Sequence, residues 1–193
     1  MLSQNFVLPC NDEKKVKKVI KLKKIILALL VIITAFCAAG ATELVKISKI
    51  TGTVNIKTPD GDSVNYKNIS DIPEFLYGSK VTAVKGAATV SLLKTVTVAL
   101  GNRQGIFITK NPITKAIELF RLDIKGGYGD IKADLAGLAT VTFGPNTKIA
   151  FSEEFPGTIV GVISGTAVVR SGVGRIYMLS AGEHYEVKQN LLE

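Results

Sequence analysis

The chain has 193 residues, a formal charge of +8 from 24 Lys and Arg against 16 Asp and Glu, and 47% hydrophobic residues, with two Cys and one His. This length fits one domain, or a small domain with an addressing segment, and excludes a large multidomain protein. With one His and two Cys, the chain has too few ligands for most metal centres and too few residues for most nucleophilic relays. A strongly basic chain ordinarily indicates nucleic acid or an acidic membrane surface as a partner. Whether this holds here depends on where along the chain the basic residues lie.

The first part of the chain has the order of a secretory signal. Seven Lys and only two acidic residues lie within residues 1–24, and an uncharged apolar run follows at residues 25–41. Small residues crowd the end of this run, where Ala39 and Ala41 are of the kind that a signal peptidase accepts. The pattern predicts an N-terminal hydrophobic helix that is cleaved after Ala41, which makes Thr42 the first mature residue.

A retained membrane anchor is the alternative for the same segment. A helix of the 17 residues 25–41 is about 25 Å long, slightly short of the roughly 30 Å hydrocarbon core. The preceding lysines hold the N-terminus in the cytoplasm in either case and direct residues 42–193 across the inner membrane. Lipidation at Cys37 is disfavoured because the bulky Phe36 precedes it. We therefore predict export to the bacterial periplasm or beyond, with anchoring through residues 25–41 as the open alternative.

Cleavage changes the charge and the cysteine content of what remains. Residues 42–193 contain no Cys and have 17 basic against 14 acidic residues, a net charge of +3. Nucleic acid is then not an expected partner, because few basic residues remain to neutralise a row of phosphates. A domain of this size can build a sufficient core without disulfides.

The exported part alternates between apolar and polar residues with a period close to two. Short runs rich in Val, Ile, Thr and aromatic residues are separated by Gly, Pro and Asn turn signals. This pattern predicts an all-β domain, a β-sandwich or jelly-roll-like roll of many short antiparallel strands. Only residues 71–76 suggest a helical turn. The predicted strands are 50–56, 80–84, 88–93, 95–100, 106–109, 118–124, 131–135, 138–143, 148–151, 158–163, 167–170, 176–179 and 185–188.

An internal repeat is predicted at an offset of 51 residues. This offset places Tyr77-Gly78 on Tyr128-Gly129 and Ala88-Thr89-Val90 on Ala139-Thr140-Val141, and seven of the 24 positions in residues 77–100 are identical between the copies. Apolar positions are kept while charged ones vary. A duplicated structural unit behaves in this way, whereas a duplicated active site keeps its polar groups.

Several Gly and apolar motifs resemble the FecR domain, the periplasmic module named after the ferric-citrate transport regulator. The resemblance covers about Val45 to Val187. Its motifs are Ile50-Thr-Gly52-Thr-Val54, Phe75-Leu76-Tyr77-Gly78-Ser79-Lys80-Val81-Thr82, Ala88-Thr89-Val90-Ser91-Leu92, Gly165-Thr166-Ala167-Val168-Val169 and Tyr177-Met178-Leu179-Ser180-Ala181-Gly182-Glu183.

The resemblance implies a role at the cell envelope. Regulators of this family carry a cytoplasmic domain that binds a sigma factor, a membrane helix and a periplasmic part that responds to an outer-membrane transporter. Only 24 residues precede the apolar run here, too few for a folded sigma-binding domain. The chain is therefore more similar to stand-alone exported FecR-domain proteins, with a membrane-anchored signal-transduction module as the alternative.

Candidate catalytic and metal-binding groups are few. His184 is the only imidazole and is expected on the face opposite Tyr185, beside solvent. Adjacent Glu153 and Glu154 point to opposite faces of a strand, so they do not form a catalytic pair. We predict no catalytic residue, no cofactor and no metal site.

Three weaker features have ordinary structural explanations. Asp60 and Asp62 with Asn65 offer oxygen ligands for Ca²⁺ but lack the closing Glu of a calcium loop, so a turn is the better interpretation. Residues 126–129 form a Gly-rich turn without the residues of a phosphate-binding loop. The five tyrosines suit sugar stacking in principle, although packing is commoner. They are Tyr66, Tyr77, Tyr128, Tyr177 and Tyr185.

These observations together predict a non-enzymatic exported envelope protein. The expected partner is an envelope protein, a glycan or a cell-wall component, bound through loops or an exposed sheet face. Nucleic acid is not expected, and the inner membrane is contacted during export or through the N-terminal helix.

Overall fold

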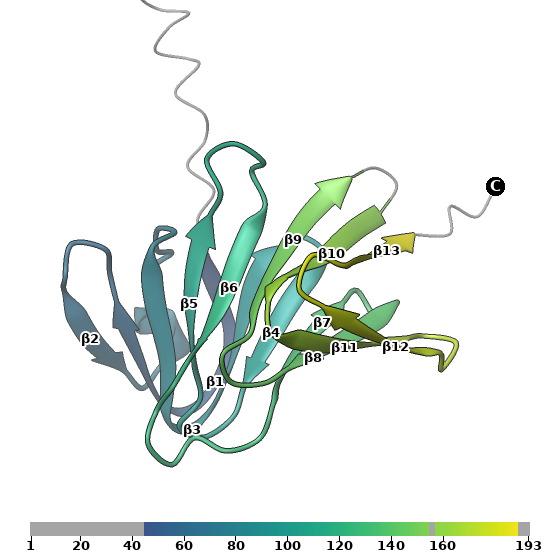
Figure 1. Cartoon of the computed structure of the whole chain (residues 1–193). Coiled ribbons are helices and arrows are strands. Elements are labelled where there is room, and N and C mark those ends of the chain that lie inside the picture. Colours follow the sequence, from purple (N-terminus) through teal and green to yellow (C-terminus); the bar gives the residue numbers. More distant parts are fainter. Residues whose placement is uncertain (1–44, 155–156, 189–193) are drawn as a thin grey trace, which may run out of the picture. The chain divides into compact units, whose positions relative to one another are not determined.

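The computed structural model describes residues 45–154 and 157–188, and within them the protein is all-β (Figure 1). The predicted fold class is confirmed at this level. The predicted hydrophobic helix and the cleavage residues Ala39, Ala41 and Thr42 lie outside the described residues. Within the described part, no helix is both long and apolar enough to cross a membrane.

Thirteen strands and one short 3₁₀ helix make up the described part of the chain. They are β1 (Lys46–Lys57), β2 (Ser63–Tyr66), η1 (Ile69–Asp71), β3 (Ser79–Leu93), β4 (Val96–Leu100), β5 (Gly105–Lys110), β6 (Ile117–Leu122), β7 (Ile131–Leu135), β8 (Ala139–Phe143), β9 (Lys148–Glu154), β10 (Gly157–Ser164), β11 (Thr166–Ser171), β12 (Ile176–Ser180) and β13 (His184–Lys188).

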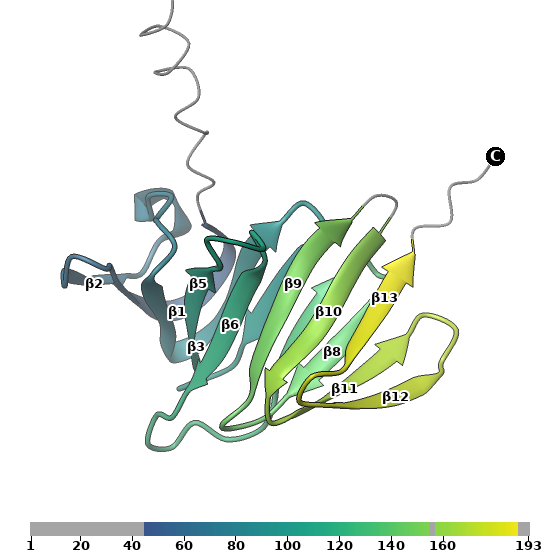
Figure 2. The ribbon, with the colours of Figure 1, turned by 45° about the horizontal axis from the view of Figure 1, so that its top comes forward.

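All strands belong to one antiparallel sheet that divides at β3. One edge of β3 pairs with β1 along its length, whereas its other edge pairs with β5 in the first half and with β4 in the second. The sheet therefore continues in two directions. Layer 1 runs β5-β6-β9-β10-β13 from the first half of β3, and layer 2 runs β4-β7-β8-β11-β12 from the second half. Figure 2 shows the strands of the two layers facing each other.

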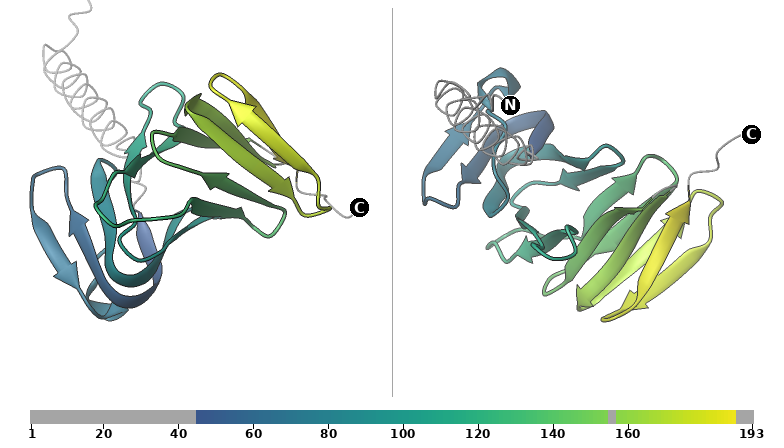
Figure 3. Two further views of the ribbon diagram at one scale, coloured as in Figure 1. Left: turned by 60° about the horizontal axis from the view of Figure 1, so that its bottom comes forward. Right: turned by 90° about the horizontal axis from the view of Figure 1, so that it is seen from above.

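After β4 the chain crosses between the layers at every second connection. The hairpin β5–β6 lies in layer 1, β7–β8 in layer 2, β9–β10 in layer 1 and β11–β12 in layer 2, and β13 returns to layer 1. Strand pairs are thus added to the two layers alternately along the chain. The free ends of the sheet, β12 and β13, come next to each other (Figure 3).

Two facing glycines produce the bend that separates the layers. Gly52 of β1 is paired with Gly86 of β3, and both have a positive φ, 95° and 85°. A Cβ on Gly52 would collide with the backbone carbonyl of Lys85, and one on Gly86 would collide with that of Thr51. The ladder also shifts register between Thr53 and Val54. Only glycine therefore fits both positions of the bend.

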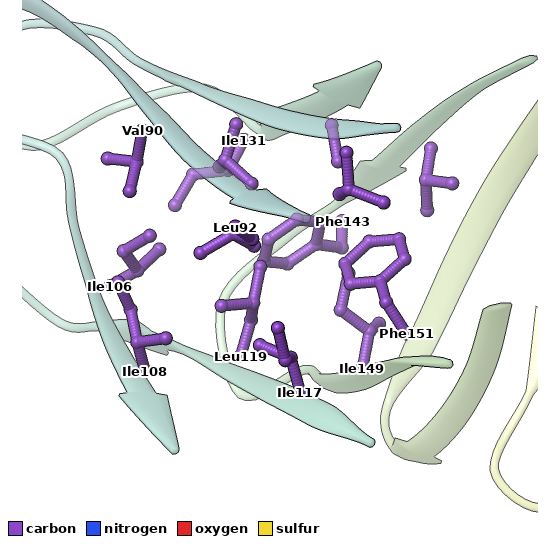
Figure 4. Packing of buried hydrophobic residues seen from close by; sticks show 14 of the residues in the cluster. Val90, Leu92, Ile106, Ile108, Ile117, Leu119, Ile131, Phe143, Ile149 and Phe151 are labelled. Carbon is purple, nitrogen blue, oxygen red and sulfur yellow. The ribbon is translucent and has the colours of Figure 1, made fainter. Parts of the chain in front are cut away.

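The core lies between the two layers and is continuous. Alternate residues of most strands are buried, as in β4, where Val96, Val98 and Leu100 face inward. Figure 4 shows Val90 and Ile131 of layer 2 on one side of the core and Ile108 and Leu119 of layer 1 on the other. Its largest fully buried side chains are Phe143, Phe151, Leu100, Ile106, Ile108, Ile117, Leu119, Ile131, Leu135 and Ile149.

Three details of the sequence prediction are wrong. Residues 80–84 and 88–93 were expected as two strands, but they form the single strand β3, because Gly86 bends the strand without ending it. The short strand β2 was not expected, since none of its four residues is buried. The helical turn expected at residues 71–76 is the 3₁₀ helix Ile69–Asp71, which begins two residues earlier.

The prediction that the internal repeat is a duplicated structural unit is also wrong. In the first copy, the second half of β3 pairs directly with β4. The corresponding strands of the second copy, β8 and β9, lie in different layers and pair with other strands. The shared apolar positions reflect burial on one face, which any half-buried strand requires.

We predict that Gly86→Ala lowers the free energy of unfolding by more than about 3 kcal/mol, because a strained φ is combined with a backbone collision. Gly61→Ala is the matched control, since Gly61 has a φ of 98° but no atom lies within 4 Å of its Cβ position. It should lose only about 1 kcal/mol. Urea unfolding measures both variants. Equal losses would contradict the role assigned to the bend.

Candidate functional site

The residues considered for catalysis do not gather into a site. His184 is exposed at the start of β13, on the face opposite the half-buried Tyr185. Glu153 and Glu154 are both exposed at the end of β9, where Glu153 Oε1 accepts a hydrogen bond from the Thr95 hydroxyl at 3.4 Å. Within the described ranges, no three His, Cys, Asp or Glu side chains lie close enough to hold a metal ion.

The turn at Asp60 and Asp62 is held by the backbone. The Thr58 N–H donates to the carbonyl of Asp62 at 2.8 Å, and the N–H of Gly61 donates to the carbonyl of Thr58 at 3.1 Å. The Asn65 amide oxygen accepts from Asn55 Nδ2 at 2.9 Å. The predicted turn between β1 and β2 is therefore confirmed.

The Gly-rich loop at residues 126–129 is tied to the end of the core by two buried polar side chains. Gln104 Nε2 donates to the carbonyls of Tyr128 and Gly129, at 2.8 and 3.0 Å. Arg121 is only 6% exposed, and its Nη2 donates to the carbonyl of Gly127 at 3.2 Å. Its other terminal nitrogen, Nη1, has no hydrogen-bond partner among the described residues. Both side chains have a structural role in positioning the loop.

Four of the five tyrosines pack against the core. Tyr66, Tyr77, Tyr177 and Tyr185 are partly buried against it. Tyr128 differs, because it is 85% exposed in the loop before β7. The packing interpretation is thus confirmed for four tyrosines.

The most distinctive surface feature is the seam, which we define as the gap between the end strands β12 and β13. Within the described residues, no backbone ladder joins these two strands. Side chains bridge the gap instead, because the rings of Tyr177 and Tyr185 lie 4.7 Å apart, centroid to centroid. Burial and the neighbouring Tyr177 raise the pKa of the Tyr185 hydroxyl above its ordinary value, as expected where water is partly excluded.

The edge strand β12 has no charged residue. Its inward side chains are Tyr177 and Leu179, and its outward side chains include Ile176 and Met178, which are 59% and 74% exposed. Edge strands usually carry charges, prolines or bulges that block pairing with another strand. By contrast, β13 has charged Glu186 and Lys188 on its outer side. Of the two strands that flank the seam, β12 is therefore the one with an unprotected edge.

Surface hollows lie at both ends of the seam. One of about 440 Å³ is lined by Tyr177, Met178, Leu179, Gly182, Glu183 and His184, at the turn that joins the two strands. The other, of about 320 Å³, lies between β13 and the turns that precede β8 and β12. The seam is therefore hollowed at its two ends and bridged by the two tyrosines.

The sequence contained part of this site. The run Ile176-Tyr-Met-Leu-Ser180 is apolar on both of its faces and uncharged, which is unusual for a strand with one solvent-facing side. Its position at the end of the sheet depends on pairing between distant segments, so the pattern alone did not reveal it.

No protein-family model matches the chain, and no curated protein or solved structure matches it. The fold defines an all-β protein built from one bent antiparallel sheet. The resemblance to the FecR domain stays a prediction that rests on the motifs.

Proposed function

We propose that the chain is a non-enzymatic, exported envelope protein whose roll-like, FecR-like domain binds an extended segment of another envelope protein. The segment adds as a strand to the free edge of β12. The observation that carries this proposal is the uncharged edge strand at an unclosed seam.

Backbone chemistry favours a polypeptide at this edge. An edge strand presents a row of N–H and C=O groups that another extended backbone satisfies at each pairing position. A glycan or wall polymer offers no such regular series of donors and acceptors. The outward Ile176 and Met178 then supply apolar contacts that select alternate side chains of the added strand.

The N-terminal segment supports export, and its processing separates the two candidate roles. We predict that the native protein begins at Thr42, because Ala39 and Ala41 suit a signal peptidase. Mass spectrometry of the native N-terminus measures this directly. A native protein that still contains residues 25–41 would favour the membrane-anchored signalling module.

We predict that Met178→Lys abolishes strand addition, because a lysine on the edge opposes pairing in the way that natural edge strands do. A photoreactive amino acid at Ser180, exposed on the same strand, should cross-link a polypeptide in the envelope fraction. The added Met178→Lys change should reduce the cross-link at least tenfold. It should leave stability within about 0.5 kcal/mol, since the site is exposed.

Ile113→Lys is the matched control, because Ile113 is also exposed and lies in the turn between β5 and β6, outside the seam. It should leave the cross-link unchanged. A cross-link that survives Met178→Lys would contradict strand addition at β12. Hydrolysis of a wall polymer by the purified chain would contradict the non-enzymatic role.

A further inference from the structure

A row of lysines and phenylalanines crosses the outer face of layer 1 and its β1–β3 extension. The strand registers place Lys57 of β1 opposite Lys80 of β3, Lys80 opposite Phe107 of β5, Phe107 opposite Phe120 of β6, and Phe120 opposite Lys148 of β9. We call these five residues the lysine–phenylalanine row. Their neighbours along each strand are buried in the core, so all five face outward.

The charge of the row is concentrated at one end. Lys148 Nζ lies 2.6 Å from Glu118 Oε2, and its hydrogen bond is the main reason why the pKa of Glu118 lies below the ordinary value. Lys148 is therefore neutralised by its neighbour. Lys57 and Lys80 form no ion pair with any described residue, although they are directly opposite each other. Like charges in this arrangement repel, and a bound anion would relieve the repulsion.

Two aromatic rings lie beside this positive end. Phe120 is 38% exposed, which is unusual for a phenylalanine on a sheet with its own core. Lys80 Nζ lies 5.7 Å from the centre of the Phe107 ring. Cross-strand packing accounts for the contact between Lys80 and Phe107, but it does not account for the exposed Phe120 or for the second lysine at position 57.

Amide and hydroxyl groups adjoin the row at the same end. Ser63 of β2 is opposite Lys57. Asn55 Nδ2 lies 3.1 Å from Ser63 Oγ and 2.9 Å from Asn65 Oδ1. These exposed groups both donate and accept hydrogen bonds, as the hydroxyls of a sugar do.

We propose that the lysine–phenylalanine row binds an acidic linear polysaccharide. Carboxylates of the polymer pair with Lys57 and Lys80, sugar rings lie on Phe107 and Phe120, and sugar hydroxyls bond to the Asn55 group. This site is separate from the seam and goes beyond the proposed function.

Charge density favours a polysaccharide over a nucleic acid. Strands lie about 4.8 Å apart, so the four steps from Lys57 to Lys148 extend over roughly 19 Å. One strand of a DNA duplex places five to six phosphates along that length, at about 3.4 Å each. The row offers only two lysines that are not already neutralised. A uronic-acid polymer fits this pattern better, because its pyranose rings present apolar faces to Phe107 and Phe120 and hydroxyls to the Asn55 amide.

The test measures binding of the full-length chain to polygalacturonate by isothermal titration calorimetry. Lys57→Gln with Lys80→Gln should weaken binding at least tenfold, and Phe120→Leu should weaken it about fivefold through lost stacking. The control pair, Lys49→Gln with Lys132→Gln, removes the same charge from exposed positions on β1 and β7 outside the row. It should change binding less than twofold. All variants keep residues 1–24, so the lysines of that segment contribute equally.

Three results would overturn the proposal. Equal weakening by the two double variants would mean that binding follows net charge alone. Unchanged binding by Phe120→Leu would remove the aromatic rings from the site. Tighter binding of a single-stranded oligothymidylate than of polygalacturonate would assign the row to nucleic acid. Met178→Lys should bind polygalacturonate like the unmodified chain, so failure of this proposal and failure of strand addition are distinguishable.

Discussion

The fold depends on the close approach of two backbones at Gly52 and Gly86. Neither position accepts a Cβ, and both have a positive φ that side chains rarely adopt. The bend they permit directs the two halves of β3 into different layers, because β5 pairs with one half and β4 with the other. The arrangement of the strands after β4 depends on this division. The layers enclose one continuous core, and the chain adds a strand pair to each layer in turn until the two ends of the sheet meet.

The same division creates the surfaces that we assign to binding. No ladder joins the end strands β12 and β13 of the bent sheet, and they meet instead through the rings of Tyr177 and Tyr185. The charged β13 is a poor template for another strand, whereas the uncharged β12 is a good one. Layer 1 also has a broad outer face, where cross-strand register aligns residues from five segments into one row. Edge and face therefore suit different chemistries, backbone pairing at β12 and acidic sugars on the row.

The alternation of apolar and polar residues was sufficient to predict most strands but not to predict which strands pair. Alternation located β4, β7 and β8 closely, because each buries one face in a regular way. It divided β3 at Gly86, since a glycine that bends a strand has the same sequence signal as one that ends it. The seam and the row depend on which distant strands become neighbours, and this information is not local. The two surfaces that we propose for binding emerged only from the register.

The open seam is tested most directly by amide hydrogen exchange across β12 in the full-length protein. A strand paired on one side only should show alternate slow and fast amides, since every second N–H points away from β11. We expect this alternation from Ile176 to Leu179, because the N–H of Ser180 already donates to Glu183 Oε2 at 2.6 Å. Uniformly slow exchange along β12 would mean that β12 and β13 are hydrogen-bonded in a closed barrel, which would contradict a free edge and, with it, the proposed mode of binding.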